Sequence, residues 1–129
     1  MTPKQTPEAM LGRDFGTLPE LIRLYAEAAP ERVAFKLGAQ SQSYAALDRL
    51  MDRVAGAFQR AGAKQGDAAA ICAATSLEYL AVFLGALRAG LAVVPLSSSA
   101  TAESLRMMLE DSGAAYFFLD ARTDEILQG

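Results

Sequence analysis

The sequence has no histidine, no tryptophan and a single cysteine, Cys72. The absence of histidine excludes a histidine-based catalytic triad, a histidine general base and a histidine metal ligand within this chain. A single cysteine allows no internal disulfide, which favours a reducing compartment, so we expect a cytoplasmic protein. Because Cys72 lies in an apolar stretch with no base nearby, we interpret it as a buried, inert thiol rather than as a nucleophile.

An excess of positive charge and long uninterrupted apolar runs are also missing. The chain has 12 Lys and Arg against 15 Asp and Glu, and the net charge of -3 argues against a nucleic acid partner. The best candidate for a membrane span, residues 79–96, contains Arg88, Gly90 and Pro95, so we expect no span. Residues 1–14 lack the apolar core of a secretory signal.

What the sequence does contain is enough apolar material for one buried core, since 52% of its 129 residues are hydrophobic. Residues 1–16 are polar, and we expect them to form a mobile lead-in. Thr17-Leu18-Pro19-Glu20 then has the form of a capping box, which predicts a helix that Pro30 ends. Two short extended segments, 33–37 and 42–44, are joined by a glycine-containing turn and predict a hairpin.

A long amphipathic helix follows over residues 44–61, with Ser43 as its predicted N-cap. Its apolar residues recur at three-four spacing and form one stripe. The opposite face carries charged residues that we interpret as a solvated surface: Asp48, Arg49, Asp52, Arg53 and Arg60.

Residues 67–119 alternate between apolar strands and helices, which is typical of a parallel α/β layer. The predicted strands are 68–74, 91–96 and 115–119. The helix between the first two strands is apolar nearly all round and opens with a second predicted capping box, Thr75 to Glu78; the next helix is capped by Thr101 and closed by Gly113. The fold class we expect is therefore α/β, a partial parallel sheet flanked by helices.

This sheet has too few strands for its apolar character. Buried parallel strands need covering layers on both faces, and sheets of this kind usually have about five or six strands. We therefore expect the segment to be an incomplete part of a larger fold, or one partner of an oligomer such as a homodimer that shares a core.

Candidate site residues lie in the loops that follow the strands. Thr75 and Ser76 open a helix, and two interpretations stand for them: simple N-capping or contact with an anion. Ser97, Ser98 and Ser99 follow a strand at the edge where open α/β sheets bind ligands, and either form a polar loop or line a ligand passage. Three further carboxylates, Glu103, Glu110 and Asp111, suggest no catalytic chemistry, and we interpret them as surface charges. We interpret Met107 and Met108 as core filler.

Taken in order, the segments resemble the N-terminal stretch of adenylate-forming enzymes, the superfamily of acyl- and aryl-CoA synthetases, luciferases and peptide-synthetase adenylation domains. The similarity covers about residues 17–120, and the series is specific although each motif alone is weak. The stretches that carry it are Thr17-Leu18-Pro19-Glu20-Leu21, Pro30-Glu31-Arg32-Val33-Ala34, Ser43-Tyr44-Ala45-Ala46-Leu47, Gly66-Asp67, Ser76-Leu77-Glu78-Tyr79, Leu87-Arg88-Ala89-Gly90 and Leu109-Glu110-Asp111-Ser112-Gly113-Ala114.

The resemblance implies a ligase that activates a carboxylate with ATP and Mg²⁺ to an acyl-adenylate and passes the acyl group to a thiol, usually that of coenzyme A. Residues 17–129 are then part of the N-terminal domain of such an enzyme. The family's phosphate loop, adenine-binding segment, ribose-binding aspartate and mobile lysine are not found in this sequence. We therefore expect the chain alone to be inactive and to need no cofactor, with the rest of the parent chain as its partner.

The stretch Leu91-Ala92-Val93-Val94-Pro95-Leu96-Ser97 is more similar to acyl-CoA synthetases than to adenylation domains, which tend to have a glycine pair before the proline and an aspartate after the leucine. By the same resemblance, Ser97, Ser98 and Ser99 are expected to border the acyl and pantetheine passage. Two other hypotheses stay open. One is a stand-alone binding or assembly module that oligomerises through its unfinished sheet, and the other is a flavodoxin-like nucleotide binder.

Overall fold

The structure, a computed structural model, describes residues 17–97 and 99–128, so the expected lead-in at residues 1–16 lies outside the described residues. In chain order the elements are α2 (Leu18–Ala28), β1 (Val33–Leu37), β2 (Gln40–Ser43), α3 (Tyr44–Arg60), β3 (Ala68–Cys72), α4 (Leu77–Arg88), β4 (Ala92–Pro95), α5 (Ala102–Ser112), β5 (Tyr116–Leu119) and α6 (Ala121–Gln128). None of the helices described there is long and apolar enough to cross a membrane.

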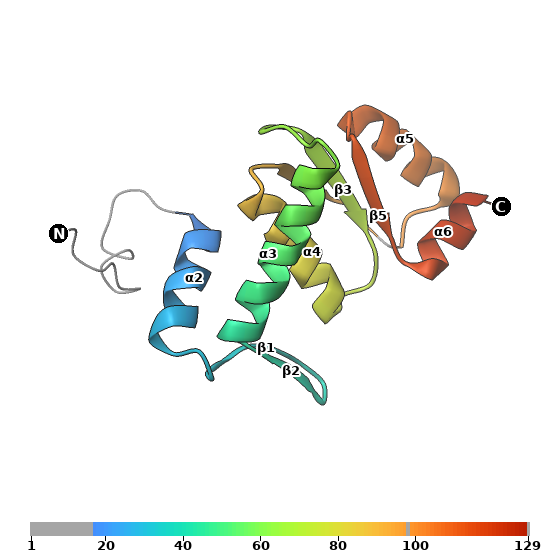
Figure 1. Cartoon of the computed structure of the whole chain (residues 1–129). Helices are drawn as coiled ribbons and strands as arrows, with labels where there is room; N and C mark the ends of the chain where they lie inside the picture. Colours follow the sequence, from blue (N-terminus) through green and yellow to red (C-terminus); the bar gives the residue numbers. More distant parts are fainter. Residues whose placement is uncertain (1–16, 98, 129) are drawn as a thin grey trace.

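A parallel sheet with the strand order β4-β3-β5 forms the centre of the fold (Figure 1). Ala70 of β3 pairs with Val94 on one side and with Phe117 on the other. The β3 residues Ala69, Ala70 and Cys72 have no exposed surface. Their side chains are small, so helices approach both faces of this strand closely.

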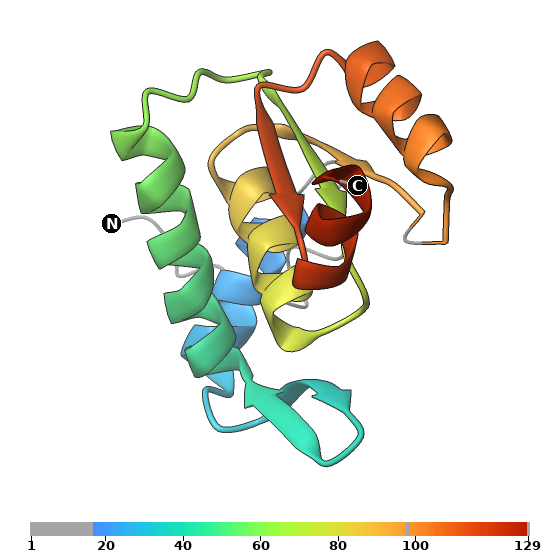
Figure 2. The same ribbon diagram turned by 90° about the vertical axis from the view of Figure 1, so that its right-hand side faces the viewer.

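The two faces of the sheet are covered by different helices. On one face, Phe58 of α3 and Ala86 of α4 pack with Ala69, and on the other, Leu105 and Leu109 of α5 pack with Ala70 and Cys72. Figures 1 and 2 show α3 and α4 together on one side and α5 on the other, with the separate hairpin β1–β2 below the helices. The predicted α/β class is confirmed.

Helix starts follow the predicted caps in three places. Thr17, Ser43 and Thr101 each accept a hydrogen bond from a backbone N–H three residues later. The cap of α4 is a correction: Ser76, not Thr75, accepts from the Tyr79 N–H at 3.0 Å. The helical bonds begin with the Ser76 carbonyl, so the predicted box starting at Thr75 is out of register by one residue.

Helices α3 and α4 touch at a glycine. A Cβ atom at Gly85 would lie 2.5 Å from Cβ of Val54 and 3.2 Å from the Met51 carbonyl oxygen. The two helix backbones can approach this closely only because position 85 has no side chain. This contact fixes α4 between α3 and the sheet.

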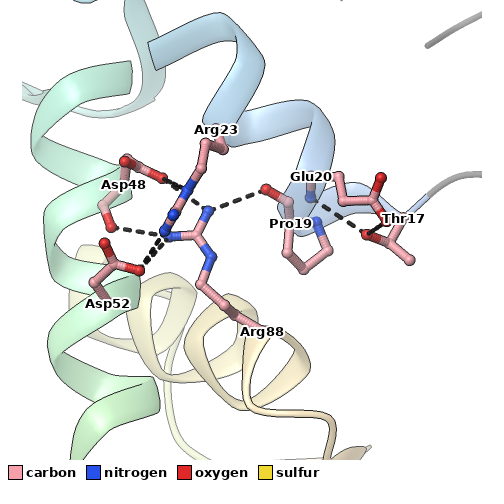
Figure 3. A network of polar contacts seen from close by, with 7 residues as sticks. All are labelled: Thr17, Pro19, Glu20, Arg23, Asp48, Asp52 and Arg88. Carbon is pink, nitrogen blue, oxygen red and sulfur yellow. Dashed lines mark hydrogen bonds and ion pairs between the residues drawn. The ribbon is translucent and has the colours of Figure 1, made fainter. Parts of the chain in front are cut away.

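The charged face of α3 is only partly solvated. Asp48 and Asp52 form ion pairs with Arg23 of α2 and Arg88 of α4 (Figure 3). The Arg88 side chain is 12% exposed and also donates to the backbone carbonyls of Pro19 and Asp48, each at 3.0 Å. Asp52 is exposed, as interpreted from the sequence, although it pairs with both arginines. The interpretation of Asp48 as solvated was wrong, because its side chain is only 20% exposed and its partners come from two other helices.

A second correction concerns Met107. It is 58% exposed on α5 and is not core filler, whereas Met108 packs against the α5 core cluster. The two residues are adjacent on a helix and therefore point in different directions.

The glycine contact predicts opposite effects for two substitutions on the α3–α4 pair. Gly85→Ala should lower the free energy of unfolding by about 1–3 kcal/mol, because the new methyl group meets Val54 and a backbone oxygen. Gly56→Ala is the control: its Cβ would meet only the end of the flexible Arg60 side chain, and alanine favours the helix by up to about 1 kcal/mol. Urea denaturation of both variants measures the difference, and equal stabilities would contradict the close contact.

The ion-pair network predicts that Arg88→Met destabilises the fold by about 2–4 kcal/mol. The substitution removes the largely buried guanidinium group that pairs with Asp48 and donates to two backbone carbonyls. Arg53→Met removes an exposed arginine of α3 and should change stability by less than about 0.5 kcal/mol. Thermal unfolding followed by circular dichroism compares the two variants. A loss at Arg88 no larger than that at Arg53 would show that the network is only a surface feature.

Candidate functional site

The candidate site lies at the carboxyl edge of the parallel sheet. Because β3, β4 and β5 run in the same direction, their carboxyl ends meet at this edge. The chain leaves β3 toward α4 on one face and leaves β4 toward α5 on the other. Ligands of open α/β sheets bind where neighbouring loops diverge in this way.

Cys72 connects the end of β3 to the segment that follows β4 and to helix α6. Its Sγ donates to the Ser97 carbonyl at 3.5 Å, and its side chain also hydrogen-bonds Thr123, which is itself buried. Burial raises the pKa of the Cys72 thiol, and the Thr123 hydrogen bond opposes this rise in part. The predicted burial of this thiol is confirmed.

Ser97 and Ser99 lie at the sheet edge, as expected from the sequence, and both are exposed. Their hydroxyl groups hydrogen-bond each other at 2.8 Å, and Ser97 Oγ also accepts from the Ser99 N–H at 3.3 Å. Ser98 lies outside the described residues. The described pair forms a closed polar turn, and its place beside an acyl and pantetheine passage stays a prediction.

Asp120 is a site residue that the sequence interpretation missed. It follows β5, accepts from the Ala74 N–H at 2.9 Å and from the Thr123 N–H at 2.8 Å, and so ties the β3–α4 loop to the start of α6. Hydrogen bonds from the Thr123 side chain and the Ala74 N–H lower the pKa of Asp120 to about 2. An aspartate directly before a short polar helix is the capping signal that would have found it.

A cavity of about 390 Å³ lies beside these groups, between β3, α4 and the end of β5. Its walls are mainly apolar, and its polar side chains are the carboxylates of Glu78 and Asp120 and two side chains with hydroxyl groups, Ser76 and Tyr79. The lining residues are Ile71, Ala73, Ala74, Ser76, Glu78, Tyr79, Val82, Phe118, Leu119 and Asp120.

The chemistry of this cavity favours an apolar group and disfavours an anion. The Ser76 hydroxyl accepts from the Tyr79 N–H, so this residue acts as the predicted type of N-cap. Glu78 and Asp120 repel negative charge at the cavity. The cavity therefore does not provide a phosphate cradle.

Neither a second groove nor a metal site adds catalytic groups in the part of the chain that the structure describes. A groove of about 580 Å³ runs between α2, α3 and α4, but the guanidinium groups of Arg23 and Arg88 that line it are paired with Asp48 and Asp52. Over residues 17–97 and 99–128, no cluster of three or more acidic or cysteine side chains is close enough to hold a metal ion.

Comparison with known proteins decides the family. The sequence profile of the family described as "AMP-binding enzyme" matches residues 22–128. The chain belongs to the AMP-binding enzyme family. The resemblance to adenylate-forming enzymes is thereby confirmed.

Among curated relatives, this AMP-binding family member is 34% identical over 104 residues to a plipastatin synthase of Bacillus subtilis (strain 168), a match that covers 81% of this chain and 4% of the relative. It is 38% identical over 94 residues to a linear gramicidin synthase of Brevibacillus parabrevis, a match that covers 73% of this chain and 2% of the relative. The chain thus spans only a small part of the curated relatives that it matches.

Solved structures share the fold of the AMP-binding family member. The N-terminal domain of FACL13 from Mycobacterium tuberculosis aligns with a TM-score of 0.82 at 23% identity, covering 88% of this chain and 29% of that one. A fatty acyl CoA synthetase from Mycobacterium tuberculosis aligns with a TM-score of 0.77 at 23% identity, covering 85% of this chain and 22% of that one. In both of these solved proteins the matched fold is a part of a longer chain.

The lowered pKa of Asp120 predicts that the stability of the fold falls in acid. A carboxylate whose pKa is about 2 in the fold and near 3.8 when unfolded stabilises the fold above about pH 4, and this contribution is lost as the pH falls toward 2. Asp120→Asn should therefore flatten the fall of the melting temperature between pH 4 and pH 2, and Thr123→Val should flatten it in part. Melting curves across this range that are parallel for wild type and both variants would contradict the assignment.

Proposed function

We propose that this chain forms the first part of the AMP-binding domain of an enzyme that activates a carboxylic acid with ATP and Mg²⁺. The carboxylate attacks the α-phosphate, pyrophosphate leaves, and an acyl-adenylate forms. The observation that carries the proposal is the family match over residues 22–128, supported by the fold shared with longer members. The free, buried Cys72 fits a cytoplasmic enzyme.

The role proposed for this part is structural support of the sheet edge, not chemistry on phosphate. The described cavity at this edge carries two carboxylates, and the described residues hold no cluster of metal ligands. The triphosphate and Mg²⁺ would therefore be bound by other parts of the whole enzyme. The closed turn of Ser97 and Ser99 would border the passage of the acyl group and thiol.

For the second step, we propose coenzyme A as the thiol that accepts the acyl group. The stretch from Leu91 to Ser97, with Val94 before Pro95 and no aspartate after Leu96, supports this acceptor by its similarity to acyl-CoA synthetases. A fatty acyl CoA synthetase is also among the solved structures with the same fold.

A peptide-synthetase adenylation domain is the second candidate. It is favoured by the curated relatives, since synthases of plipastatin, linear gramicidin and surfactin are 31–38% identical to this chain. In that case the substrate would be an amino acid and the thiol would belong to a carrier protein instead of coenzyme A.

The isolated chain should show no ATP–pyrophosphate exchange with any carboxylic acid, because nothing in its described part cradles the triphosphate. Turnover by the 129-residue chain above the level of a heat-denatured sample would contradict this division of roles.

A pair of chimaeras tests the function itself. Residues 22–128 would replace the matched stretch of the Mycobacterium tuberculosis fatty acyl CoA synthetase in one chimaera and of the Brevibacillus parabrevis linear gramicidin synthase in the other. We expect both to retain exchange, and the coenzyme A proposal predicts the higher activity, with acyl-CoA as product, in the first. Higher activity in the gramicidin synthase host would favour the second candidate, and no activity in either would count against both.

A further inference from the structure

Helix α3 presents a basic face to solvent. Arg49, Arg53 and Arg60 are exposed, and none of them forms an ion pair with another residue of 17–97 or 99–128. Arg53 and Arg60 are seven residues apart, so they lie on the same side of the helix at a rise of about 10 Å. The two carboxylates of α3 are already paired with arginines of other helices, which leaves this face with an excess of positive charge.

The surface of α3 is low between Arg53 and Arg60. Gly56 and the exposed Ala57 occupy the positions between these two arginines. The guanidinium group of Arg60 lies over the glycine, since a Cβ atom at position 56 would be 3.2 Å from its Nη1. Small residues on one helix allow a second helix to approach closely. The face therefore suits a helix that carries two negative charges with an apolar side chain between them.

The outer face of α5 has this complementary pattern. Glu103 and Glu110 are exposed, seven residues apart, and form no ion pair with any other residue that the structure describes. Met107 lies between them on the same side of the helix and is 58% exposed. Arg106 is close to this face, but its guanidinium group donates to a backbone carbonyl of α6 at 2.7 Å. Residues 99–128 carry six carboxylates and two arginines, so α5 and α6 together are acidic.

The two faces match when the helices run antiparallel. With Glu103 opposite Arg60, the second carboxylate falls opposite the second arginine, and the exposed methionine falls opposite Gly56, because both helices use the same spacing. Within one chain the faces do not meet, since α3 and α5 cover opposite faces of the sheet (Figures 1 and 2). We propose that the basic face of α3 docks the acidic face of α5 from a second copy of this chain. The inference is independent of the proposed function, because it uses no residue of the carboxyl edge.

The proposed contact joins two different surfaces and is therefore heterologous. A copy that binds one neighbour through α3 keeps its α5 face free for another neighbour. Because these helices lie on opposite faces of the sheet, the contact does not close on two copies, and further copies add in a row. Exposed ion pairs are individually weak and are screened by salt, so the association is reversible and falls as the salt concentration rises.

The test begins with the mass of the full chain in solution. Light scattering over a range of protein concentrations is compared at about 0.01 M and about 1 M NaCl, where the Debye length is about 30 Å and about 3 Å. At low salt the mean mass should rise with concentration beyond that of a dimer, and at high salt it should fall to that of a monomer. Association that stops at a dimer, or that persists at high salt as a contact between apolar sheet edges would, overturns the proposal.

Two charge-reversed chains locate the contact. Arg53→Glu combined with Arg60→Glu reverses the α3 face, and Glu103→Arg combined with Glu110→Arg reverses the α5 face. In either variant both faces carry the same sign, so each should associate at least about tenfold more weakly than the wild type. An equimolar mixture should regain association, since each reversed face then meets a face of opposite charge. A mixture that associates no better than its components would overturn the assignment.

A matched control changes the net charge elsewhere. Arg32→Glu combined with Lys36→Glu alters the charge by the same amount as the α3 variant, at two exposed positions of the hairpin region. It should leave the association constant within about twofold of the wild type, because screening weakens charges far from the contact. A loss as large as in the α3 variant would show that net charge governs association and would overturn the docking surface. Circular dichroism verifies that every variant is folded, and the α5 variant tests the same contact without altering α3.

Discussion

The structure depends on the complete burial of β3 between two helical layers and two neighbouring strands. Ala69, Ala70 and Cys72 have no exposed surface, and their small side chains allow α4 on one face and α5 on the other to lie close to the strand. Burial of these backbone groups is stable because both edges of β3 are hydrogen-bonded, to β4 and to β5. The carboxyl-edge loops are held in place by this central strand.

The two sides of the sheet differ in how closely other elements pack against them. Gly85 brings α4 against α3, and Arg88 ties α4 to both α2 and α3, so the helical layer is fixed without further polypeptide. On the β5 side, the rings of Tyr116 and Phe118 contact the ring of Phe58, and the side chain of Phe117 is 52% exposed. Phe117 is the large exposed apolar side chain of this strand, and the others among the described residues lie on α2, β1 and α5: Leu18, Val33, Leu37 and Met107.

Local signals were enough to predict most of the fold from the sequence. The caps Thr17, Ser43 and Thr101 act on backbone groups three residues away, so their patterns are visible without the tertiary structure. The start of the short helix α6 has a local signal too, since Asp120 accepts from the Thr123 N–H three residues later, but the bond of Asp120 to Ala74, 46 residues away in the sequence, has none. The pairing of Asp48 with Arg88 was missed for the same reason, since nothing local on α3 distinguishes a paired carboxylate from a solvated one.

The candidate site was predicted only in its location. The sequence placed Ser97 and Ser99 at the ligand-binding edge of the sheet, whereas the cavity at this edge is formed by residues such as Tyr79 and Phe118 that periodicity assigns to the core. Whether an apolar side chain of a strand is covered or lines a cavity depends on what packs beside it, and a single sequence does not show that.

Amide hydrogen exchange of β5 tests most directly whether this unit is completed by other polypeptide. In the isolated, monomeric chain, the amides of residues 116–119 should exchange much faster than those of β3, and fusion to the rest of an AMP-binding domain should slow them to the rate of the buried strand. Protection of β5 equal to that of β3 in the monomer alone would contradict the account.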